Sequence, residues 1–342
     1  MAMKVLAFYD QNGPAYHRLF IPLSAMPELD VTFTNYVGPE GEVKETDLQN
    51  YQVVIFNRVF PANKLSDMIK LRQRYGFKLI CDLDDHWDLD PHHILYQHYK
   101  EKNLSTYILH AVTIADAVTV THERLADAVL PYNKNVWVLP NAIDDKHPQF
   151  NIQHQPGDRV RLFWAGGITH ENDINILRNP LKRVCSDSYL KEKVMMVMCG
   201  HMDGYPVWDK MVSAFTNGLQ LKGSILKGRP VNDYYSLYEF ADICLVPLVD
   251  SKFNRNKSNL KILEAANAGK PVIVSDVHPY LDFPTDLVNY VEHQSDWYRL
   301  IRGLVRNRLF AEEQGERLKA YCKEHYNFDK INKVRCELIT GI

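Results

Sequence analysis

The residues best suited to chemistry lie in the C-terminal third, where a charged segment precedes an apolar strand. In the stretch N-K-S-N-L-K-I-L-E-A-A-N-A-G-K-P-V-I-V-S, residues 256–275, Ser258 or Asn259 can cap a helix that continues to Ala268. Gly269 is typical of a helix end, and the proline two residues later prevents its continuation. The pattern predicts a short helix that opens at a polar loop and leads into a buried strand.

The start of this helix is suited to binding a diphosphate. Lys257, Lys261 and Glu264 fall along one polar stripe at 3.6 residues per turn, and a second stripe can pack under a sheet. The free N–H groups of the first turn, the positive end of the helix dipole and the two lysines attract a diphosphate, and the glutamate can bind ribose hydroxyls. The same residues also fit an ordinary amphipathic helix with Lys–Glu pairing, so both interpretations stay open at this point.

Length and composition limit the class of protein. The 342 residues favour two domains, and 46% hydrophobic with 24% charged residues is ordinary for a globular protein. No run of 18 apolar residues occurs, and the N-terminus leads directly into a strand pattern, so we expect a cytoplasmic protein without integral membrane association. The net charge of −2 gives no global attraction to nucleic acid. Six cysteines without a C-x-x-C pair predict buried thiols.

Short apolar runs alternate with helical patterns along the chain, which predicts parallel sheets. The first series of expected strands covers 4–9, 31–36, 53–57, 78–82, 117–121 and 136–139. After a polar stretch at 145–157, a second series covers 160–164, 193–199, 219–221, 243–246, 272–275 and 287–291. We therefore predict an α/β protein with domains at 1–145 and 146–313 and a helical C-terminal segment at 314–342.

Polar residues follow the expected strands at the edge where parallel sheets bind ligands. D-L-D-D-H at 82–86 ends one strand of the first domain. Its D-x-D spacing fits a carboxylate site for Mg²⁺ or Mn²⁺, a set of polar groups for an acceptor hydroxyl, or a structural turn. After the first strand, Gly13 permits close backbone approach and His17 or Arg18 can reach a phosphate, although a capped helix with a surface arginine fits them equally.

Four motifs between 136 and 247 resemble those of the nucleotide-sugar glycosyltransferases of the GT-B fold, in their retaining, family-4-like group (glycosyl transferases group 1). They are V-W-V-L-P-N-A-I-D at 136–144, F-W-A-G-G-I-T-H at 163–170, L-K-G-R-P-V at 226–231 followed by 235–242, and D-I-C-L-V-P at 242–247. The resemblance implies two Rossmann-like parallel-sheet domains facing a cleft, with 314–342 packing back on the first. It implies a hexosyl- or pentosyltransferase (EC 2.4) that needs no metal, because a helix dipole and basic side chains neutralise the leaving diphosphate.

The resemblance assigns the donor, a nucleoside-diphosphate-sugar, to the second domain, with a UDP-sugar as the first expectation and no further cofactor. Its expected contacts are Gly166, Gly167, Thr169 and His170 at the phosphates, Arg229 and Val231 near the base, Asn256 at a sugar hydroxyl, Lys257, Ser258, Asn259, Leu260 and Lys261 on the diphosphate, and Glu264 on the ribose. Gly13 and Arg18 are expected to approach the donor from the first domain. The candidates for catalysis are His17, Asp84, Asp85, His86 and Lys257, with the aspartates near the acceptor hydroxyl.

The chain departs from the family pattern at three places. Ala142 replaces a glycine in the first motif, and Asn256 replaces the first of two glutamates spaced as Asn256 and Glu264 are. The Arg–Lys clamp that usually follows the glycine loop is missing. We expect Lys257 and Lys261, assisted by His170, to neutralise the diphosphate instead.

The acceptor is the least determined feature. The resemblance implies a hydroxyl acceptor, first a saccharide, and implies that the leaving diphosphate acts as the base in a retaining transfer. Hydroxylated bases of viral DNA are an alternative acceptor, with a strip of basic residues at Lys64, Lys70, Arg72 and Arg74. A nucleotide- or sugar-binding protein without turnover and a sugar epimerase of the same fold are the rival functions. The sequence does not indicate the oligomeric state.

Overall fold

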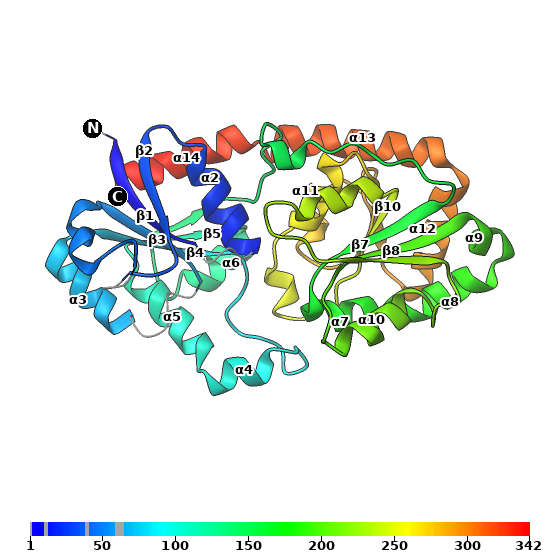
Figure 1. Cartoon of the computed structure of the whole chain (residues 1–342), viewed down its shortest axis with the longest axis horizontal. Coiled ribbons are helices and arrows are strands. Elements are labelled where there is room, and N and C mark those ends of the chain that lie inside the picture. The colour runs from blue at the N-terminus through cyan, green and yellow to red at the C-terminus, as the bar shows by residue number, and fades with distance from the viewer. Residues whose placement is uncertain (1, 10–12, 38–40, 59–64) are drawn as a thin grey trace. The chain divides into compact units, whose positions relative to one another are not determined.

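The computed structural model describes residues 2–9, 13–37, 41–58 and 65–342 (Figure 1). Within them the chain forms two compact units, each built on a parallel sheet covered by helices. The first unit comprises Met1–Ala142, Asn256–Ser258 and Tyr326–Ile342, and the second comprises Ile143–Arg255 and Asn259–His325. The C-terminal helices are therefore divided between the two units.

The sheet of the first unit has the strand order β2-β1-β3-β4-β5-β6 in the described residues, and every neighbouring pair is parallel. Its strands are β1 (Met3–Phe8), β2 (Leu29–Thr34), β3 (Val53–Asn57), β4 (Lys78–Leu83), β5 (Ala117–Val120) and β6 (Val136–Val138). The register sets Asn57 beside Asp82 and Asp82 beside Thr119. Polar residues near the carboxyl ends of three strands thus become neighbours.

Helices cover both faces of this sheet. They are α1 (Gly13–Ala15), α2 (Ile21–Ser24), α3 (Leu65–Tyr75), α4 (Tyr96–Glu101), α5 (Leu104–Ile114), α6 (Glu123–Val129) and α14 (Phe328–Gly341), with a π-helical turn at Tyr16–Phe20 joining α1 to α2. On one face Leu338 and Ile339 of α14 pack against Val5, Ala7 and Ile55. The last helix therefore completes the core of the unit that contains the first strand.

The sheet of the second unit has the strand order β12-β11-β10-β7-β8-β9 and is parallel throughout the described residues. Its strands are β7 (Val160–Ala165), β8 (Val194–His201), β9 (Gly223–Lys227), β10 (Ile243–Val246), β11 (Val272–Ser275) and β12 (Asn289–Val291). Its helices are α7 (Glu171–Asn175), α8 (Arg178–Ser186), α9 (Ser188–Lys193), α10 (Val207–Phe215), α11 (Leu260–Asn267), α12 (Gln294–Arg306) and α13 (Arg308–His325).

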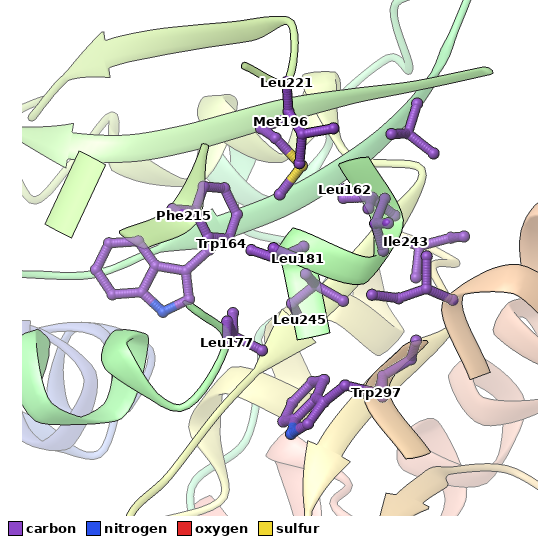
Figure 2. Close-up of a cluster of buried hydrophobic side chains, with 14 of the residues drawn as sticks. Leu162, Trp164, Leu177, Leu181, Met196, Phe215, Leu221, Ile243, Leu245 and Trp297 are labelled. Atoms are coloured by element: carbon purple, nitrogen blue, oxygen red, sulfur yellow. The ribbon is translucent and has the colours of Figure 1, made fainter. Parts of the chain in front are cut away.

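One large apolar cluster holds the second unit together (Figure 2). Leu162 and Trp164 of β7 and Met196 of β8 meet Leu181 of α8 and Trp297 of α12, and each is at most 2% exposed. Burying a large apolar side chain contributes about 1.5–3 kcal/mol. This core fixes the strand ends and loops that carry the candidate site.

The prediction of a strand at 219–221 is wrong. Leu219 is 74% exposed and has a φ of +67°, in the left-handed region, after the end of α10. The Thr216 hydroxyl oxygen accepts the Leu219 N–H at 3.0 Å, which closes that helix end. The strand instead forms at Gly223–Lys227, because the chain first has to turn back to the sheet. Of the six cysteines, five are buried as predicted and Cys336 is half-buried.

The basic strip on α3 does not form a free phosphate-binding surface in the described residues. Arg72 donates to Asp116 at 2.6 Å and to the Ile114 carbonyl oxygen at 2.7 Å, and Arg74 lies 3.4 Å from Glu45. Lys64 lies outside the described residues. The two arginines therefore bind to groups of the first unit itself.

Candidate functional site

The helix expected at the diphosphate position is present as α11, which begins after Asn259 and ends as predicted at Gly269, where φ is +67°. Its first turn carries Lys261, whose Nζ donates to the Ala165 carbonyl oxygen at 2.5 Å. The same ammonium group lies 5.7 Å from the centre of the Trp164 ring. Ala165 is the last residue of β7, so Lys261 sits at the carboxyl end of the central strand, directly beside the glycine loop.

That loop depends on the absence of side chains. A Cβ atom at Gly166 would lie 2.6 Å from the Trp164 ring, and one at Gly200 would lie 2.0 Å from the Gly166 carbonyl oxygen. Gly200 also has a φ of +107°, which favours glycine. The ends of β7 and β8 can therefore approach each other closely, and Gly167 begins the turn Ile168–His170 that leads into α7.

Glu264 corrects the predicted polar face of α11. The prediction placed it on a polar stripe with Lys257 and Lys261, but Glu264 is buried and only 5% exposed. The Tyr234 hydroxyl donates to one carboxylate oxygen and the Tyr238 hydroxyl to the other, the latter at 2.8 Å. The Tyr235 hydroxyl donates to the Glu264 backbone carbonyl at 2.9 Å. The Y-Y-x-x-Y spacing of these tyrosines places two hydroxyls on one side of a helical turn, a signal from which the contact with Glu264 could have been predicted.

Burial raises the pKa of the Glu264 carboxyl, while Lys261 and the hydroxyls of Tyr234 and Tyr238 lower it. The carboxylate is thus held in place by two donors and faces a lysine from the same helix. Each carboxylate oxygen has more than one lone pair, so the two tyrosine bonds leave the group with further capacity to accept hydrogen bonds.

His170 is oriented by an aspartate that the sequence did not single out. Its Nδ1 lies 2.7 Å from an Asp173 carboxylate oxygen. The other oxygen of Asp173 accepts the Val249 N–H at 2.8 Å and the Asn254 side-chain amide at 3.4 Å. Asp173 is 4% exposed and three residues beyond His170, so it connects the glycine loop to the loop after β10.

The other residues that were expected to contact the donor make contacts within the protein or lie elsewhere in the structure. Arg229 is exposed and donates to Ser236 at 2.5 Å, and the Val231 carbonyl oxygen accepts from Gln149 at 3.0 Å. Thr169 and Leu260 are half-buried in the second unit. Asn256, Lys257 and Ser258 group with the first unit, whereas Asn259 and α11 belong to the second. The structure of the second unit therefore brings together Gly166, Gly167, His170, Lys261 and Glu264.

Arg18 is an interior residue, which corrects its expected role as a phosphate ligand. It is 1% exposed, and its Nη2 and Nε donate to Asp82 at 2.7 and 3.1 Å. Its Nη1 donates to the Leu139 carbonyl oxygen at 2.5 Å and to Asn141 at 3.2 Å. All three guanidinium nitrogens are used inside the first unit, so Arg18 positions strand ends instead of binding an anion.

His17 is also buried, and burial together with Arg18 lowers its pKa to about 4. It is therefore neutral at neutral pH and supplies no positive charge for a phosphate. No atom of the described residues lies within 4 Å of a Cβ atom placed at Gly13, which begins α1, so these residues require no glycine there.

The D-x-D segment forms a charged cluster with Arg58. The guanidinium of Arg58 lies 3.3 Å from Asp85 and 3.9 Å from Asp84, and it also donates to the His86 carbonyl oxygen at 3.3 Å. His86 is 2% exposed and stacks on Trp87. Asp82 and Asp84 thus face guanidinium groups of the protein. The pairing of Arg58 with these aspartates follows from the register of β3 beside β4, which places the residues after the two strands side by side.

Comparison with known families places a family match in the second unit. Residues 159–299, which contain the glycine loop, Lys261 and Glu264, match the family model "Glycosyl transferases group 1". The chain carries a group 1 glycosyltransferase domain. A search of curated proteins finds no significant match.

Solved structures share the GT-B fold with this glycosyltransferase over nearly its whole length. HepE from Anabaena, in complex with UDP and glucose, is 14% identical with a TM-score of 0.68, covering 99% of this chain and 100% of that one. A glycosyltransferase from Rickettsia africae is 12% identical with a TM-score of 0.65, covering 99% and 98%. The E. coli structure described as trehalose-6-phosphate bound with UDP-2-fluoro glucose is 10% identical with a TM-score of 0.69, covering 99% of both chains. These likenesses show the fold.

Two further properties of the glycosyltransferase bear on the site. Across the described ranges, no group of three or more His, Cys, Asp or Glu side chains is arranged to hold a metal ion. In the same part of the chain, no helix has both the length and the apolar character needed to cross a bilayer.

Asp84→Asn is expected to gain stability over the wild-type glycosyltransferase as the pH rises. Burial, and then the charge of Asp85, raises the pKa of the Asp84 carboxyl from 3.8 to about 6. A raised carboxyl pKa gives stability that is present below pH 3.8 and is lost as the pH rises through about 6, because ionisation costs more in the folded state than in the unfolded chain. The asparagine does not ionise, so the difference should grow by up to about 3 kcal/mol between about pH 4 and pH 7.

Urea unfolding of both proteins across this pH range measures the difference. Asp30→Asn, an exposed position in the same unit, is the matched control and should follow the wild type. A constant difference between Asp84→Asn and the wild type would contradict the buried, raised-pKa assignment.

Proposed function

We propose that the protein transfers a sugar from a UDP-sugar to a hydroxyl acceptor with retention of configuration. The observation that carries this proposal is the position of Lys261 and Glu264 on α11. The lysine meets the carbonyl end of β7 beside Gly166, and the glutamate three residues later is fixed by two tyrosine hydroxyls. A diphosphate needs positive charge and a ribose needs fixed acceptors for its hydroxyls, and the two groups supply these on one helix.

The choice of UDP is supported by the solved relatives, since HepE is in complex with UDP and glucose. Retention is carried over from the resemblance to the family, in which the leaving diphosphate acts as the base toward the acceptor. Neutralisation by Lys261 and by the start of α11 takes the place of a metal ion in this proposal. A saccharide remains the first expectation for the acceptor, and the pairing of Arg72 and Arg74 with carboxylates disfavours DNA.

Thermal unfolding in the presence of UDP, GDP, ADP, CMP and dTDP, with and without Mg²⁺, tests the donor. A ligand at a hundred times its Kd adds about 2.7 kcal/mol, which should raise the melting temperature by about 5–10 °C. We expect this shift with UDP and no dependence on Mg²⁺. A shift with another diphosphate would change the donor base, and a strictly Mg²⁺-dependent shift would contradict the metal-independent donor site.

Product analysis with a UDP-sugar separates the rival functions. Release of UDP, increased by a hydroxyl acceptor, is the expected result for a transferase. Binding without release of UDP would indicate a binding protein, and a changed sugar still attached to UDP would indicate an epimerase. Incubation with saccharides and with hydroxymethylated DNA then distinguishes the two acceptor classes.

A further inference from the structure

A second polar cavity lies in the same unit as the candidate donor site, at the other edge of the sheet. It has a volume of about 220 Å³, and its lining includes Lys270, Lys319, Lys323 and Asp145. Lys270 precedes the first residue of β11, so the cavity lies at the amino ends of the strands. Lys261 and the glycine loop lie at the carboxyl ends. The cavity and the lysine of the donor site thus lie at opposite ends of the strands, although Tyr238, which donates to Glu264, also lines the cavity.

The lysines give this cavity an excess of positive charge. Lys323 is paired with Asp145 at 2.8 Å, which leaves the charges of Lys270 and Lys319 uncompensated within the lining: three ammonium groups against one carboxylate give +2. Asp242, near Lys270, is already held by Arg161 at 3.0 Å and by His154 at 3.1 Å. In the described residues neither Lys270 nor Lys319 makes an ion pair or hydrogen bond through its ammonium group.

Polar uncharged groups also line the cavity. Asn267, at the end of α11, donates to the Phe150 carbonyl oxygen at 3.0 Å and to the Tyr235 hydroxyl at 2.8 Å, and both it and Asn151 border the cavity. His154 also lines it, and burial followed by the charge of Lys270 lowers the His154 pKa, which keeps the imidazole neutral. The two N–H groups of Asn267 are thus used within the protein, and the site offers lysine ammonium groups and the Asn151 amide. The space is smaller than the ~300 Å³ at which pockets for drug-sized ligands begin.

We propose that this cavity binds a small phosphate-class dianion, separately from the donor. A phosphate group carries about −1.5 to −2 charge near neutral pH, which matches the uncompensated charge of the lining. Its oxygens accept hydrogen bonds from ammonium and amide groups, and charge-assisted bonds of this kind are the strong ones. Burial lowers the pKa of Lys270, while the charges of Asp242 and Glu312 raise it. A bound dianion raises that pKa again.

The competing explanation is that the lysines stabilise the C-terminal ends of helices through their positive charge. Lys319 and Lys323 lie in the last turns of α13, and Ala268 at the end of α11 borders the cavity, where cations are favourable to the helix dipole. Under that explanation, removing the lysines lowers stability but leaves any response to phosphate unchanged. Under the proposal, the response to phosphate is lost.

Titration of the full chain with inorganic phosphate, at constant ionic strength maintained with NaCl and followed by thermal unfolding and calorimetry, tests the site. The wild type and K261Q, which removes the lysine at the donor site, should both bind phosphate. K270Q/K319Q should weaken the apparent Kd by at least about tenfold, the value of one charge-assisted hydrogen bond. K182Q/K191Q removes two exposed lysines of the same unit that do not line the cavity, and it should behave as the wild type.

Equal phosphate binding by K270Q/K319Q and the wild type would overturn the proposal, as would loss of binding in K261Q alone, which assigns the ion to the donor site. If K270Q/K319Q does not unfold cooperatively, K319Q alone at its half-buried position provides the same comparison. Because UDP binding is measured separately on the wild type, failure of the phosphate site and failure of the donor assignment give different results.

Discussion

Asp82→Asn is expected to lower the free energy of unfolding of the first unit by about 3–5 kcal/mol, the range for breaking a buried ion pair. Asp82 is 2% exposed, and its carboxylate accepts from Arg18 at 2.7 Å, from the Thr119 hydroxyl at 2.6 Å and from Asn57 at 2.9 Å. The carboxylate therefore joins the ends of β3, β4 and β5 to the helical segment after β1. Replacing it with an amide removes the charge that stabilises a buried guanidinium.

A second buried guanidinium makes the loss of Asp82 more costly than the loss of Arg18. Arg335 of α14 is 7% exposed, and its pKa is lowered to about 9, first by burial and then by Arg18, while Asp82 raises it. Without Asp82, two buried guanidinium groups face each other with no carboxylate. Without Arg18, Asp82 still has Arg335 nearby. Arg18→Met should therefore destabilise the first unit less than Asp82→Asn, and Arg18→Met/Asp82→Leu should recover part of the loss, because the apolar pair needs no desolvated charge.

Hydrogen exchange of β4 and β5, followed by mass spectrometry, reads the stability of this unit by itself. Asp30→Asn, with the same change of atoms at an exposed position, should stay within about 0.5 kcal/mol of the wild type. A loss for Arg18→Met as large as that for Asp82→Asn would show that Arg335 does not compensate for the missing arginine.

The parallel-sheet fold could be predicted because its signals are local. Val53–Asn57 and Lys78–Leu83 are continuous apolar runs that end in polar residues, and both form strands at those positions. The helix α11 was predicted from its polar start and from Gly269, which adopts the left-handed conformation that the helix end requires. The same reasoning failed at Leu219, where the leucines after α10 belong to a turn and only the following residues reach the sheet.

The candidate site was less predictable because its contacts are non-local. Helical periodicity places Glu264 on the same stripe as Lys261, yet the glutamate is buried by tyrosines 26 to 30 residues earlier in the chain. Arg18 follows a strand and carries charge, which suits a phosphate ligand, but its partner Asp82 is 64 residues away. These groups meet only when elements distant in the sequence pack together, and the local patterns used for prediction do not contain that packing.

Lys261→Met is expected to lower kcat/KM for UDP release from a UDP-sugar by at least about a hundredfold, the range for removing one group that stabilises charge in a transition state. The Lys261 ammonium lies at the end of β7, 2.5 Å from the Ala165 carbonyl oxygen, where the leaving diphosphate is proposed to gain negative charge. The loss should appear mainly in kcat, since the charge on the diphosphate increases as the bond to the sugar breaks. Lys222→Met, an exposed lysine of the same unit, is the matched control and should leave both constants unchanged.

Glu264→Gln tests the other half of the same helix and should act differently. The amide keeps the shape of the side chain and can still bond to the hydroxyls of Tyr234 and Tyr238, but it lacks the charge that strengthens hydrogen bonds from ribose. We expect about a tenfold rise in KM with little change in kcat, because ribose contacts are the same in the ground and transition states. With UDP-glucose as the first donor tried, a Glu264→Gln protein with reduced kcat and normal KM would place the carboxylate at the reacting sugar and not at the ribose. Normal kinetics for Lys261→Met would exclude Lys261 as the side chain that neutralises the diphosphate.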